Sequence, residues 1–100
     1  MKDDATLLQS YVRNRSEGDF AELVRRHVNL VYSAALRQVN GDVHLAQDIA
    51  QSVFIDLSRK AEALSQRQVL IGWLYTSTHF ASATAVRTEQ RRREIGRAHV

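Results

Sequence analysis

The sequence contains no cysteine and no proline, and only four of its 100 residues are glycine. Without cysteine the chain has no disulfide, no thiolate ligand for zinc and no cysteine nucleophile, and the cytoplasm is the expected location. Without proline, and with little glycine, few residues can interrupt a helix. This composition favours an all-helical protein that does no cysteine chemistry.

The motifs that identify many enzymes and metalloproteins are absent as well. There is no HExxH, GxGxxG or GxxxxGK sequence, and Asp48 and Asp56 are too far apart on one helix to share acid/base work. His27 falls on an apolar stripe, where a packed core histidine is the expected role. We therefore expect no catalytic residue, no metal site and no cofactor.

Long apolar runs are missing from the chain. Its first ten residues include Asp3 and Asp4 and no apolar segment of the required length, so we expect neither a signal peptide nor a membrane span. A length of 100 residues, 44% of them hydrophobic and 25% charged, suits a single folded domain. We expect this domain over residues 1–94, followed by an unpatterned tail or truncated linker over 95–100.

The net charge of +3 is unevenly distributed. Residues 1–50 carry a net charge of −1 and residues 51–100 carry +4, and arginines over 87–97 supply most of the excess. An arginine-rich end on a small domain favours a polyanionic partner, with nucleic acid ahead of membrane lipid because no amphipathic apolar face accompanies the arginines. A solvated helix end would have the same composition.

Apolar residues recur at steps of three and four, which predicts helices throughout. We expect a compact all-α domain with a short helix from Asp4 to Arg13 and three long helices over about 17–39, 43–59 and 71–93. Ser16 and Asp42 are the expected N-caps of the first two long helices, and Asn40 with Gly41 ends the helix before them. Gly96 is expected to break the last helix.

One side of the helix over 43–59 carries the apolar stripe of Ala46, Ile49, Ala50, Val53 and Leu57. The opposite side is expected to expose His44, Asp48, Gln51 and Ile55. From Lys60 to Leu70 the period is lost, and the polar residues Ser65, Gln66, Arg67 and Gln68 predict a loop.

Four blocks of residues, in this order and at these spacings, resemble region 2 of the bacterial sigma factors of the extracytoplasmic-function type, over about residues 16–94. They are Phe20-x-x-Leu23 with His27 and Val31-Tyr32, then Asp42-x-x-x-Ala46-x-Asp48-x-x-Gln51-x-x-Phe54, then Gly72-Trp73-Leu74-Tyr75, and Arg87-x-x-x-Arg91-Arg92-Arg93.

The resemblance implies a non-enzymatic module of transcription initiation that binds core RNA polymerase and promoter DNA. Docking on the clamp helices of the largest polymerase subunit is implied for Asp48, Gln51 and Phe54, with Ile55 on the same helix. A carboxylate and an amide can pair with arginine and backbone groups of a partner helix. Phe54 adjoins Val53, and a core position is an alternative for it. An anti-sigma factor is a further implied partner.

The resemblance also places the base pocket for the single-stranded, non-template minus-ten element at Ser65, Gln66, Arg67 and Gln68. Hydrogen bonds to the base edge and a cation near the backbone can offset the cost of extracting a base. Thr76 and His79 are implied to lie near the upstream edge of the element, and Tyr75 falls on or beside the same face as a further DNA-binding candidate. An ordinary helix-surface role is the alternative for Thr76 and His79, whereas a core role is favoured for Trp73. Arg87, Arg91, Arg92 and Arg93 are expected to contact phosphates.

A second helical domain for the minus-thirty-five element, which the resemblance would imply, is not present in these 100 residues. Weak promoter affinity is therefore expected. Two other functions remain open from the residues: a non-sigma helical DNA-binding regulator, and a helical protein interaction module whose arginines serve an acidic partner.

Overall fold

The computed structural model describes residues 1–66 and 70–98, and these residues form four helices and no strand. The helix pattern expected from the sequence, one short helix and three long ones, is confirmed. In chain order the helices are α1 (Asp4–Asn14), α2 (Glu17–Gln38), α3 (Val43–Leu64) and α4 (Leu70–Ala98).

The helices begin and end where local residues satisfy the free backbone groups. The Ser16 hydroxyl accepts a hydrogen bond from the Asp19 amide at 3.3 Å, and Asp42 Oδ1 accepts one from the Leu45 amide at 3.1 Å. Between α2 and α3, Asn40 and Gly41 have φ values of 55° and 82°. This left-handed backbone ends α2 and reverses the direction of the chain within a few residues, as the sequence predicts.

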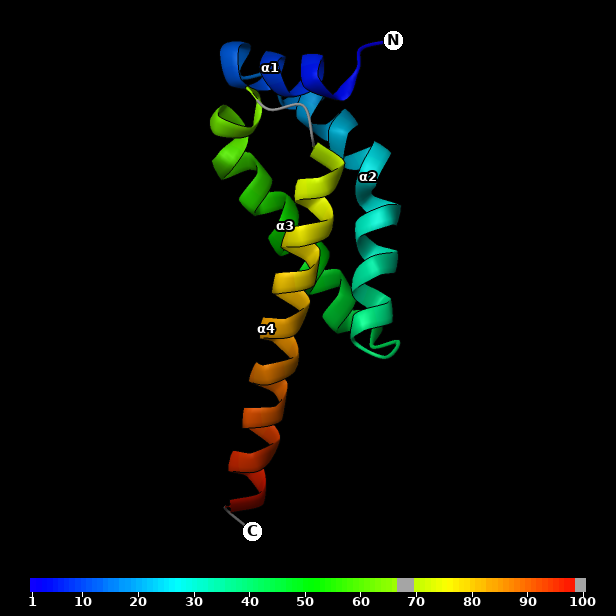
Figure 1. The fold of residues 1–100 in the computed structure, drawn as a ribbon, viewed down its shortest axis with the longest axis vertical. Coiled ribbons are helices and arrows are strands. Elements are labelled where there is room, and N and C mark those ends of the chain that lie inside the picture. Colours follow the sequence, from blue (N-terminus) through cyan, green and yellow to red (C-terminus); the bar gives the residue numbers. More distant parts are fainter. Residues whose placement is uncertain (67–69, 99–100) are drawn as a thin grey trace.

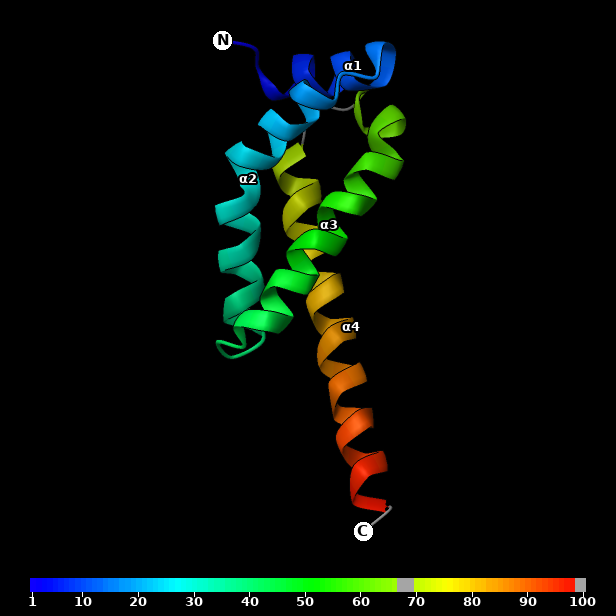
Figure 2. The same cartoon turned by 180° about the vertical axis from the view of Figure 1, so that it is seen from behind.

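Helices α2 and α3 form an antiparallel pair, α4 packs against both, and α1 lies across the end at which α2 begins and α3 finishes (Figures 1 and 2). The largest fully buried apolar side chains come from the three long helices, so these share one core. They are Leu23, Val31, Val53, Leu57 and Leu74. Burial of this apolar surface is the main stabilising term.

A polar contact fixes α1 against α2. His27 is buried as expected, and its Nε2 lies 2.7 Å from Asp4 Oδ2, while Arg26 Nη1 lies 3.3 Å from Asp4 Oδ1. A hydrogen bond from the Ser10 hydroxyl and the nearby Lys2 ammonium lower the pKa of Asp19 at the start of α2. The carboxylates of Asp4 and Asp19 thus link α2 to α1 and to the residues before it.

Two boundaries differ from the sequence-based prediction. Helix α3 does not end at Arg59 but runs on to Leu64, because Ala61 and Leu64 continue the buried stripe of Leu57 at helical spacing. Helix α4 does not break at Gly96 but continues to Ala98. A single glycine costs a helix only about 1 kcal/mol, and the arginine and glutamate residues around it favour helix.

The first part of α4 reaches the core through small polar residues. Thr78 and Ser82 are fully buried, and the Thr78 hydroxyl donates to the Leu74 carbonyl at 2.7 Å. Among the described residues, the Ser82 hydroxyl finds no hydrogen-bond partner. Beyond Val86 the helix leaves the bundle, which gives the molecule its elongated dimensions of 55 × 21 × 21 Å.

Candidate protein and nucleic-acid interfaces

The outer face of α3 presents three of the four residues expected to contact polymerase. Asp48 and Gln51 are exposed, and Ile55 is 43% exposed although it is apolar. Phe54 is only 8% exposed and packs in the core cluster. Phe54 therefore occupies the core position that the sequence analysis left open as an alternative. A partner can reach only the edge of this side chain.

A groove between α2 and α3 adjoins this face. It has a volume of about 570 Å³, and Gln51 and Ile55 stand at its α3 side. Most of the groove is apolar, since Phe20, Val24, Val28, Tyr32 and Phe54 are among the residues that line it. The sequence predicts one apolar stripe that includes Phe20, Val24 and Val28, but it does not show that part of the stripe stays accessible.

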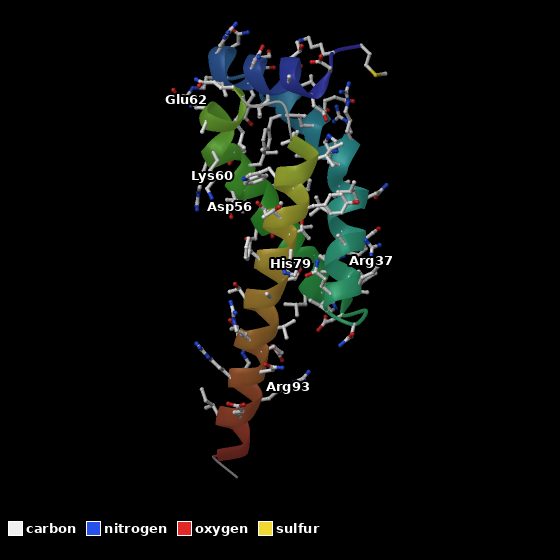
Figure 3. The ribbon with its side chains drawn as sticks, viewed as in Figure 1. Arg37, Asp56, Lys60, Glu62, His79 and Arg93 are labelled. Atoms are coloured by element: carbon white, nitrogen blue, oxygen red, sulfur yellow. The ribbon has the colours of Figure 1, made fainter. Side chains whose placement is uncertain are left out.

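A second groove, of about 470 Å³, runs between α3 and α4. Its α3 side carries Asp48, Asp56 and Lys60, and Phe80 lies on its α4 side. Figure 3 shows Asp56, Lys60 and Glu62 in succession along α3. Asp48 and Gln51 border different grooves, because three residues turn a helix by about 300° and leave the side chains about 60° apart.

The predicted base-binding loop is described only in part. Arg67 and Gln68 lie outside the described residues, whereas Ser65 and Gln66 follow directly after α3. They line a polar cavity of about 370 Å³ with Glu62 of α3 and with Ala5, Gln9 and Arg13 of α1. Gln9 Nε2 donates to the Ser65 carbonyl at 3.5 Å. Nothing in the sequence indicates that α1 reaches this end of α3.

Helix α4 exposes the residues expected at the minus-ten element. Tyr75, Thr76 and His79 are exposed, and Trp73 is half-buried against the core as expected. Phe80 was missed by the sequence analysis: it is 65% exposed, and its ring centroid lies 5.8 Å from that of His79. Its position off the inward-facing period of α4 is the signal that could have identified it.

Four arginines of the distal part of α4, Arg87, Arg91, Arg92 and Arg93, are exposed, but they do not form one stripe. Arg92 Nη1 and Arg93 Nε lie 3.9 and 3.8 Å from the two carboxylate oxygens of Glu89. Arg87 and Arg91 are four residues apart and share another face. The arginines therefore surround the helix, and one nucleic-acid strand cannot contact all of them equally.

Among the described residues, no cluster of three metal-ligating side chains occurs, and no helix is both long and apolar enough to cross a membrane.

Helix α4 carries no acidic residue from Leu70 to Thr88. This stretch carries hydroxyl and aromatic side chains and one arginine, Arg87, and a surface without carboxylates suits a polyanion.

The family model for sigma-70 region 2 matches residues 23–92, which include most of α2, all of α3 and most of α4. The chain therefore belongs to the sigma-70 region 2 family, a non-catalytic domain family with a role in promoter recognition and in binding core RNA polymerase. Comparisons with curated proteins and with solved structures give no significant match. Family membership favours the sigma factor over the two other functions that the residues left open.

Proposed function

We propose that this chain is region 2 of a sigma factor of the extracytoplasmic-function type. It docks on the clamp helices of the largest polymerase subunit through α3, and it recognises and melts the minus-ten element through the segment after α3 and through α4. The observation that carries the proposal is the exposed face of α3, where Asp48, Gln51 and Ile55 stand between two grooves.

The chemistry of this face supports a helical protein partner. Ile55 and the apolar groove beside it offer hydrophobic surface, and such surface gains free energy when a partner removes it from water. Asp48 and Gln51 can pair with arginine and backbone groups on either side of the same partner helix. Clamp helices that lie along α3 would cover all three residues at once.

The second proposed interaction is contact with promoter DNA, which we assign to α4 and to the segment before it. Thr76 and His79 can hydrogen-bond to a base edge, and Arg87 and Arg91 can neutralise phosphates. Ser65 and Gln66, with Arg67 and Gln68, are proposed to hold a base of the non-template strand. An anti-sigma factor stays a prediction from the resemblance.

A charge-reversal variant tests the docking assignment. Asp48→Arg combined with Gln51→Ala should abolish binding to a clamp-helix fragment, because it removes both polar contacts and opposes the partner's arginines. Both side chains are exposed, so the helical circular dichroism should stay unchanged.

The matched control is Glu94→Arg with Gln90→Ala, which makes equivalent changes on the exposed distal part of α4. The control should bind the fragment as the unmodified chain does. Binding of the α3 double variant with unchanged affinity would contradict the docking assignment.

A further inference from the structure

The polar cavity between α1 and the end of α3 includes Ser65 and Gln66, which the sequence assigned to base binding, but its other wall is α1, for which the sequence predicted no role. Its volume of about 370 Å³ falls in the range of small-ligand sites. Its polar groups come from two segments far apart in the sequence: Gln9 and Arg13 on α1, and Glu62, Ser65 and Gln66 at the end of α3. Helix α1 thus forms one wall, and the first residues of the proposed base-binding loop form the other.

The lining suits a neutral, planar ligand with both donors and acceptors at its edge. Val12 and Ala5 give apolar contact, whereas Gln9, Gln66, Ser65 and Glu62 provide amide, hydroxyl and carboxylate groups. The Gln9 amide nitrogen already donates to the Ser65 carbonyl, which orients the side chain and leaves its oxygen able to accept. A nucleobase has this combination of a flat apolar face and a polar edge.

The charge at the cavity agrees with a ligand that carries a phosphate outside it. Arg13 is exposed, and it makes no ion pair among the described residues. Glu62 is the only carboxylate among the described residues that line the cavity. A guanidinium at the rim can contact the backbone of a strand whose base points inward.

We propose that this cavity binds one unpaired base of the separated DNA strand, that Gln9 contacts the edge of this base, and that Arg13 contacts the adjoining phosphate. The inference rests on the proposed function and extends it, since it makes α1 part of the single-strand site. Duplex DNA cannot present a base in this way, because stacking and pairing hold the bases inside the helix.

The test measures fluorescence anisotropy of the complete chain with a single-stranded minus-ten oligonucleotide and with a series in which each position in turn lacks its base. Removal of the bound base should weaken binding by about 5- to 150-fold, the range for loss of one stacked base. Gln9→Ala should weaken binding to the intact strand and should make removal of that base nearly neutral. Non-additive losses of this kind indicate direct contact.

A second variant separates the cavity from the support that Gln9 gives to Ser65. Ala5→Leu fills the cavity and leaves the Gln9 hydrogen bond in place, so it should weaken binding to the intact strand in the same way. Ala21→Leu makes the same change at an exposed position of α2 outside the cavity, and it should have no effect.

The outcomes distinguish the cavity from the wider function. If Ala5→Leu binds as the unmodified chain does, or if Gln9→Ala and base removal are additive at every position, the cavity holds no base and the inference is overturned, while single-strand binding stands. If the unmodified chain shows no preference for the single strand over duplex, the inference and the melting role both fail.

Discussion

The two halves of α4 belong to one continuous helix but are helical for different reasons. From Leu70 to Val86 the helix packs on α2 and α3, and Leu74, Thr78 and Ser82 are fully buried. From Arg87 to Gly96 every side chain is exposed except that of Glu89, which is half-buried, and this part projects beyond the bundle (Figures 1 and 2). Tertiary contacts support the first half, and only local propensity and charge pairs support the second.

The composition of the halves matches this difference. The packed half has no carboxylate and contains small residues at the helix contacts, so the helices approach closely without burying a charge. The projecting half places several arginines around Glu89, and exposed pairs of this kind add little stability. Burial therefore determines stability in the first half, and surface charge is the property that the second half offers to a partner.

The largest expected effect comes from a core truncation in the packed half. Leu74→Ala should lower the free energy of unfolding by about 2–5 kcal/mol, because Leu74 is fully buried and its loss leaves a cavity. Ile95→Ala in the projecting half should change it by less than about 0.5 kcal/mol, since Ile95 is 60% exposed. Chemical denaturation measures both. A similar loss for Ile95→Ala would show that the projecting half is packed in solution.

A smaller effect, on binding and not on stability, is expected from the arginines. Replacement of Arg91, Arg92 and Arg93 by alanine should weaken binding to all DNA sequences alike. It should also flatten the slope of log affinity against log salt, by up to about 0.7 per lost contact on single strands and about 0.9 on duplex. Promoter preference should survive.

Single variants sharpen the same comparison. Arg91→Ala should change the salt slope more than Arg92→Ala or Arg93→Ala, because the latter two arginines share Glu89. Titrations at several salt concentrations give the slope. An unchanged slope in the triple variant would mean that these arginines serve another purpose, such as a protein contact.

The smallest expected effect concerns a single buried hydroxyl in the packed half. Ser82→Ala should leave stability unchanged or raise it by up to about 1 kcal/mol, because the buried Ser82 hydroxyl has no hydrogen-bond partner in the part of the chain that the structure describes. Thr78→Val is the comparison, since it removes a hydroxyl that donates to the Leu74 carbonyl. It should cost about 1 kcal/mol in thermal or chemical denaturation. A greater cost for Ser82→Ala would reveal a partner for its hydroxyl.

Local sequence determined the number of helices, the N-caps of α2 and α3 and the tight turn after α2. These features depend on neighbouring residues: Ser16 and Asp42 each satisfy an amide three positions later, and Asn40 with Gly41 adopts left-handed backbone without help from the rest of the chain. The order and spacing of the blocks from Phe20 to Arg93 also sufficed to indicate the sigma factor family, which the family match confirms.

Tertiary structure alone decided the length of α3, the partner of His27 and the shape of the candidate interfaces. Leu64 stays helical because its side chain enters the core, and His27 meets Asp4 from another helix. The contact of Gln9 with Ser65 joins residues 56 positions apart, and the cavity beside it likewise has walls from two helices that are distant in the sequence. Helical periodicity reports which side of each helix is apolar, but only packing determines which helices meet and which part of an apolar stripe remains open to a partner.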